Sequence, residues 1–140
     1  MRRLAPPPSG GPADGPVEKY EKSGLSDEKA ESCLKSLIHL MEGKKPYIDP
    51  DLTLAGLADQ LGVTPHNLSE VINTRIGQTF FDFINKYRVD KVVSDLADAE
   101  KKHLKLLALA FEAGFNSKSS FNSIFKRFTG QTPSDFRKHS

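Results

Sequence analysis

Apolar residues recur every three or four positions along most of the chain after residue 25, which is the spacing of amphipathic helices. A first helix is predicted over about 26–42, where the apolar stripe comprises Ala30, Cys33, Leu34, Leu37, Ile38 and Met41. No segment shows the period of two that a half-buried strand requires. The pattern therefore predicts an all-α fold.

One helical arrangement occurs twice in this pattern. A short apolar helix, a glycine turn and a second apolar helix follow one another around Gly62 and again around Gly114. Both copies end in the phrase Gly-Gln-Thr-x-x-Asp-Phe, at 77–83 and at 130–136. The two glycines of a copy lie 15 positions apart in the first and 16 in the second, so one extra turn residue is expected in the second. This arrangement is typical of a helix-turn-helix motif.

Capping signals mark the ends of these helices. Thr53 and Thr64 are predicted N-caps, and Gly114 is expected to end a helix with a positive φ. Thr79 and Asp82 resemble a capping box at the start of a long helix over about 79–98. Roughly 20 helical residues span about 30 Å, close to the ~34 Å repeat of B-DNA. The sequence thus predicts two helix-turn-helix subdomains, at about 53–76 and 105–129, joined by this helix.

Composition adds three points. Residues 1–24 hold five of the nine prolines and are expected to form a disordered tail or linker. The net charge is only +2, but residues 105–140 carry 6 basic and 2 acidic side chains, as a phosphate-facing surface needs. The single cysteine, Cys33, excludes an intrachain disulfide and is expected to act as a small buried hydrophobe rather than a redox sensor.

Several other classes of protein have no support in the sequence. Neither a membrane span nor a signal peptide is expected from the sequence, because no apolar run is long enough for a span and the first residues have no apolar segment. His39, His66, His103 and His139 are scattered without metal-ligand spacing, so neither a metal nor another cofactor is expected. No acid/base pair, phosphate-binding glycine loop or nucleophile motif indicates an enzyme.

The second copy contains the most specific motif. Its run Gly114-Phe115-Asn116-Ser117-Lys118-Ser119-Ser120-Phe121, continued by Phe125-Lys126, Gly130-x-Thr132-Pro133 and Phe136-Arg137, resembles the signature of AraC/XylS-type transcription regulators. The resemblance covers about 53–138. It implies a seven-helix DNA-binding domain within 25–140, with two helix-turn-helix subdomains and a central linker helix. The stretch 52–89 resembles a branch whose members often carry an N-terminal sensor. No sensor is expected within these 140 residues, so the chain is expected to be a DNA-binding fragment or a regulator controlled through a partner.

The resemblance also implies roles for residues of the second helix in each motif, called here the first and second reader helices. In the first, His66, Ser69 and Glu70 would face bases, and Asn67, Asn73 and Arg75 would face the DNA backbone. In the second, bases would be read by Lys118, Ser119, Asn122 and Ser123, while phosphate contacts would involve Ser117, Ser120, Lys126 and Arg127.

Two of these positions have alternative interpretations. Glu70 is acidic where many relatives have a neutral or basic residue. Its carboxylate could accept a hydrogen bond from cytosine N4 or be a solvated surface charge. His66 is expected to be a polar surface residue or a base contact rather than a metal ligand, because no partner ligand lies near it in sequence.

The resulting functional prediction is a sequence-specific regulator that binds double-stranded DNA in the bacterial cytoplasm, at the nucleoid. By resemblance it is an activator that recruits RNA polymerase, controlled by a missing or separate sensor. The alternative is a helical protein-interaction module or an adaptor for another regulator. Salt dependence separates these, since counterion release makes DNA binding steeply salt-dependent.

Overall fold

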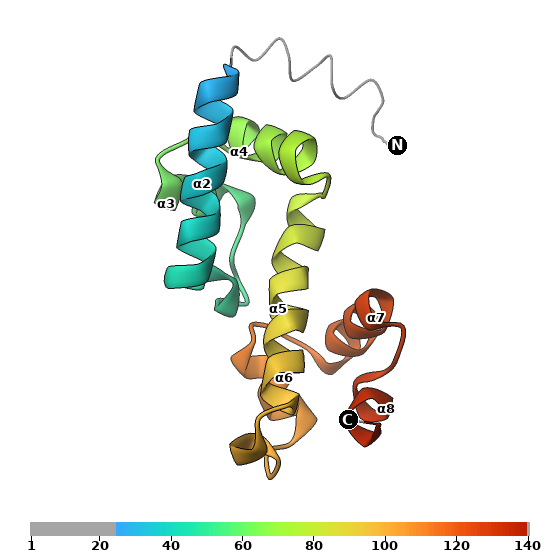
Figure 1. Ribbon diagram of the computed structural model, residues 1–140. Helices are drawn as coiled ribbons and strands as arrows, with labels where there is room; N and C mark the ends of the chain where they lie inside the picture. Colours follow the sequence, from blue (N-terminus) through green and yellow to red (C-terminus); the bar gives the residue numbers. More distant parts are fainter. Residues whose placement is uncertain (1–24, 140) are drawn as a thin grey trace. The chain divides into compact units, whose positions relative to one another are not determined.

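The computed structural model describes residues 25–139, and within that range every regular element is helical. This described part of the chain forms seven α-helices: α2 (Asp27–Gly43), α3 (Leu54–Leu61), α4 (Pro65–Val71), α5 (Phe80–Leu96), α6 (Leu106–Glu112), α7 (Lys118–Thr129) and α8 (Pro133–Lys138) (Figure 1). Short helical turns are η2 (Pro46–Ile48), η3 (Ile72–Ile76) and η4 (Ala99–Lys101). The predicted all-α fold class is confirmed; the predicted tail at 1–24 lies outside the described residues.

The described residues divide into two compact units. The first comprises residues 25–40 and 53–80, and the second comprises residues 41–52 and 81–139. The end of α2 and the segment after it, residues 44–52, therefore belong to the second unit. This segment is called here the connector. The residues on both sides, 25–40 and 53–80, belong to the first unit. Nothing in the periodicity of residues 41–52 predicted this assignment.

Both helix-turn-helix motifs are built by the same local interactions. The hydroxyls of Thr64 and Ser117 cap the reader helices by accepting the backbone N–H of Asn67 and of Ser120, at 3.1 and 3.0 Å. Each reader helix occupies 12 residues and ends at a left-handed glycine, Gly77 with φ 78° or Gly130 with φ 82°. The extra residue in the second copy lies in the turn, as the sequence predicted.

The first reader helix changes character along its length. It consists of α4 followed by the π-helical turn η3. The Asn73 amide donates to the Ser69 carbonyl at 2.9 Å, and the Thr74 hydroxyl donates to the Glu70 carbonyl at 2.7 Å. Side chains that hydrogen-bond back to the preceding turn compete with the helix's own ladder, and here they accompany its local widening.

The core of the second unit is aromatic. Val89 and Val92 of α5 pack with Ala110 of α6 and with Phe121 and Phe125 of α7. In Figure 1, α6, α7 and α8 lie beside the C-terminal half of α5. The Phe125 ring contacts the rings of Phe121 and Phe136 edge-on, at centroid distances of 5.6 and 5.4 Å. This packing fixes the rotation of α7 and so decides which of its residues face outward.

Arg88 holds the connector within this unit. Its Nε donates to the carbonyl of buried Tyr47 at 2.7 Å, and its Nη2 donates to the carbonyl of Asp49 at 2.9 Å. The Tyr47 ring also stacks on Tyr87, with centroids 5.4 Å apart. Gly114 has φ 107°, as expected for a positive-φ turn. A Cβ at this position would lie 2.2 Å from the Tyr47 carbonyl oxygen, so the connector's approach requires glycine.

Asp95 joins the end of α5 to the following turn. Its carboxylate is buried and accepts from the ammonium groups of Lys91 at 3.2 Å and Lys101 at 2.9 Å. Burial by itself raises the pKa of this carboxyl, but the hydrogen bonds and positive charges of Lys101 and Lys91 outweigh it and lower the pKa below its ordinary value.

Cys33 of α2 is buried, as expected of a small hydrophobe, and burial raises the pKa of its thiol. Less thiolate is therefore present at neutral pH than in an exposed cysteine, which does not favour redox sensing.

We predict that Gly114→Ala destabilises the protein more than Gly130→Ala. Both variants place a side chain at positive φ, which costs about 1–2 kcal/mol, but no atom lies within 4 Å of a Cβ built on Gly130. Only Gly114→Ala also drives the Tyr47 carbonyl away. Chemical denaturation of both variants measures the difference, and equal losses would show that the connector yields without cost.

We predict that the stability contributed by Asp95 depends on pH. The folded pKa lies below the unfolded value of about 3.9, so the contribution is complete above roughly pH 5 and is lost as the pH falls through the folded pKa. Asp95→Asn should therefore be less stable than wild type at pH 7, and the gap should narrow towards pH 3. A gap that is constant between these pH values would contradict the prediction.

Candidate nucleic-acid interface

The outer face of α7 brings together the residues that the sequence assigned to the second reader helix. Phe121, Ile124 and Phe125 are buried on its inner side. The exposed positions on the other side of the helix are Lys118, Ser119, Asn122, Ser123, Lys126 and Arg127. The face therefore offers hydroxyl, amide and cationic groups on a helix whose rotation the core fixes.

Two serines of this helix have structural tasks. Ser117 and Ser120 are half-buried, and the Ser117 hydroxyl already accepts the Ser120 N–H as the N-cap. The Ser123 hydroxyl lies 3.4 Å from the Ser120 carbonyl, a long contact that is easily exchanged for another partner. Asn122 and Ser119 are thus better placed for outside partners than the two capping-turn serines.

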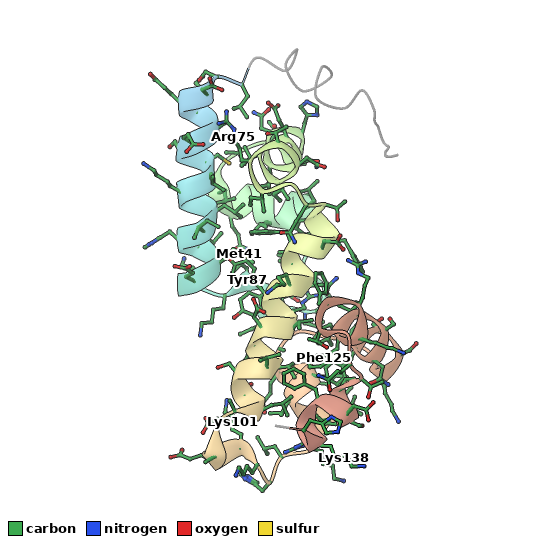
Figure 2. The ribbon with its side chains drawn as sticks, turned by 45° about the vertical axis from the view of Figure 1, so that its right-hand side comes forward. Met41, Arg75, Tyr87, Lys101, Phe125 and Lys138 are labelled. Carbon is green, nitrogen blue, oxygen red and sulfur yellow. The ribbon has the colours of Figure 1, made fainter. Side chains whose placement is uncertain are left out.

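Basic groups gather at the C-terminal end of α7 and on α8. Arg127 forms an ion pair with Asp82 of α5, and its guanidinium carbon lies 4.9 Å from the centre of the Phe128 ring. Arg137 donates to the Lys102 carbonyl at 2.7 Å, whereas Lys138 is exposed (Figure 2). The sequence interpretation missed Asp82 as a partner of Arg127, because it considered this aspartate only as a helix cap.

The first reader helix is far less accessible. His66 is exposed, but every residue from Asn67 to Ile72 is at least half-buried, including Ser69. A helix that packs on one side only would expose about half of these positions. This helix therefore presents its first turn and its end, not a continuous outer face.

Glu70 corrects the sequence interpretation. It is only 8% exposed, so it is not a solvated surface charge. The apolar pattern predicted that Leu68, Val71 and Ile72 form the buried side of this helix. The buried side also includes Glu70, which a pattern of apolar residues cannot indicate.

Arg75 and Asn73 are committed to contacts within the protein. Arg75 donates to Asp27 of α2 at 2.7 Å and to Glu31 of α2 at 3.2 Å, and Figure 2 shows it on the side of its helix that faces α2. The Asn73 amide is occupied by the Ser69 carbonyl. Both remain exposed, but a DNA phosphate would have to displace these partners.

In residues 25–139, no group of three or more His, Cys, Asp and Glu side chains is arranged to hold a metal ion. No helix in this part of the chain is long and apolar enough to cross a membrane.

Comparison with known proteins agrees with the geometry. A helix-turn-helix domain family matches residues 57–139. An uncharacterized HTH-type transcriptional regulator of Staphylococcus aureus (strain COL) is 32% identical over 91 residues, which are 65% of this chain and 12% of that protein. A protein of Streptomyces antibioticus named as an AraC-like transcription regulator is 29% identical over 119 residues, 84% of this chain and 35% of that protein. This chain thus spans a minor part of the length of these relatives.

Solved structures show the same fold. The C-terminal domain of AraT, a response regulator from Geobacillus stearothermophilus, has a TM-score of 0.66 and 25% identity, covering 84% of this chain and 89% of that one. An AraC-type DNA-binding domain protein from Chromobacterium violaceum has a TM-score of 0.66 at 18% identity, covering 81% of this chain and 96% of that one.

Proposed function

The chain belongs to the AraC-type helix-turn-helix family of DNA-binding transcription regulators, and on that premise we propose that it is a sequence-specific activator that reads two successive major-groove segments. The observation that carries the proposal is the outer face of α7, where exposed polar and basic groups stand over a fully packed inner side. Such a face fits the major groove, which admits one α-helix and displays donors and acceptors at base edges.

Base reading is proposed for Lys118, Ser119, Asn122 and Ser123, because they occupy the exposed N-terminal turns of α7. Lys126 is the proposed phosphate contact at the end of that helix, with Arg127 beside it. Ser117 and Ser120 support the backbone contact mainly by holding the first turn in place.

The first reader helix is proposed to contribute less sequence information. His66 and Ser69 remain its base-facing candidates, with Asn67, Asn73 and Arg75 towards the DNA backbone. We give Glu70 no base contact in this proposal, because it is only 8% exposed. This division makes α7 the main determinant of sequence preference.

The partners of the whole protein are part of the proposal. We expect activation to proceed by recruitment of RNA polymerase at nucleoid DNA in the cytoplasm. We further propose control by a sensor, located in a longer polypeptide or in a separate protein.

We predict that selection from a random duplex library yields two short, different boxes about 10–11 base pairs apart on one face of the DNA. The two boxes read by one chain should differ in sequence, because the two reader helices present different side chains. A footprint with one box per chain would show that only one motif reads DNA. The absence of any enriched sequence, together with a flat salt dependence, would favour the protein-interaction alternative.

We predict that two substitutions on the outer face of α7 affect DNA binding in different ways. Asn can bond adenine N6 and N7 together, so Asn122→Ala should relax preference at one or two adjacent base pairs by about 1–3 kcal/mol. Lys126→Ala should weaken binding to all sequences and reduce the salt slope by up to about one. Both positions are exposed, so thermal unfolding should change little.

Affinities for every single-base variant of the selected site, each measured at several salt concentrations, separate the two effects. A uniform loss for Asn122→Ala would assign that residue to phosphate. Altered base preference for Lys126→Ala would mean that the proposed register of α7 on the groove is wrong.

A further inference from the structure

The ion pair between Arg127 and Asp82 links the proposed DNA-binding helix to the start of α5. Arg127 lies in the last turn of α7 with 53% of its side chain exposed, and Asp82 lies in the first turn of α5 with 32% exposed. The Phe128 ring lies against the same guanidinium. The guanidinium is therefore held at the edge of the outer face of α7 by two protein groups.

A carboxylate and a phosphate satisfy a guanidinium in the same way, through parallel N–H donors to two oxygens. A guanidinium that is paired with Asp82 cannot offer the same donors to DNA. Asp82 also adds a negative charge close to the path of a phosphate that would approach Arg127. Both effects oppose phosphate binding at this end of α7.

Two other cations of α7 differ from Arg127 in this respect. Neither Lys118 nor Lys126 forms an ion pair with another residue of the described part of the chain. Both are exposed on the same helix. Arg127 is thus the cation of this helix whose contribution depends on an internal acidic partner.

Resting on the proposed DNA-binding function, we propose that Asp82 is an internal competitor of DNA phosphate for Arg127. The pair restrains the sequence-independent part of the affinity, because phosphates are offered equally by every DNA sequence. Asp82 therefore raises the ratio of specific to non-specific binding without contacting a base.

The test is Asp82→Asn in the full chain, assayed on a random-sequence duplex over a series of salt concentrations. Releasing Arg127 should tighten binding at low salt by roughly threefold and steepen the log–log salt slope by up to about one, the effect of one added phosphate contact. Asp82→Ser, which retains an oxygen acceptor in the first turn of α5, should give the same gain if Asn at this position impairs folding.

The matched control is Asp135→Asn. Asp135 occupies the same position in the second copy of the repeated phrase, is exposed, and loses the same charge, but it is not paired with Arg127. It should give a clearly smaller gain than Asp82→Asn. The second control is Asp82→Asn combined with Arg127→Ala, in which the gain should vanish relative to Arg127→Ala alone.

Equal gains from Asp82→Asn and Asp135→Asn would overturn the inference, since the effect would then be one of net charge. So would a gain that persists without Arg127. In either case the wild-type protein still binds duplex, and the proposed function stands. If the wild-type chain does not bind duplex at all, the proposed function fails and the inference fails with it.

Discussion

The carbonyl oxygen of Tyr47 is the point on which the second unit depends. A buried peptide carbonyl is costly unless it accepts a hydrogen bond, and Arg88 supplies one at 2.7 Å. The same oxygen lies where a side chain on Gly114 would stand, so the connector can reach Arg88 only past a glycine. One guanidinium, one carbonyl and one missing side chain thus place residues 41–52 in a unit from which their chain neighbours are excluded.

The two motifs share a backbone plan but differ in what their reader helices present. Hydroxyl caps, 12-residue lengths and left-handed terminal glycines are common to both. The first helix directs Arg75 to α2 and buries Glu70, whereas the second leaves six polar and basic positions exposed. Repetition has therefore preserved the interactions that make the fold, while the outer surfaces have become different. Unequal surfaces are what recognition of an asymmetric site requires.

Charge in this protein acts locally rather than in bulk. With a net charge of only +2, the chain has little long-range attraction for a polyanion. Several cations are already paired with carboxylates, among them Arg75, Lys86, Lys91, Lys101 and Arg127. On α7, Lys118 and Lys126 are exposed and form none of these ion pairs, so they are available to attract phosphate.

The sequence by itself determined the helices, their caps and the glycine turns, because apolar periodicity, hydroxyl caps and positive φ are properties of a few neighbouring residues. It also located the outer face of α7, because the helical spacing of Phe121, Ile124 and Phe125 places them on one side, which is buried, and the polar residues on the other. The tertiary structure alone decided that Glu70 is buried, that Arg75 pairs with Asp27 and that Arg127 pairs with Asp82. The reason is physical: each of these two ion pairs joins groups more than 40 residues apart in the chain, whose approach no local pattern encodes.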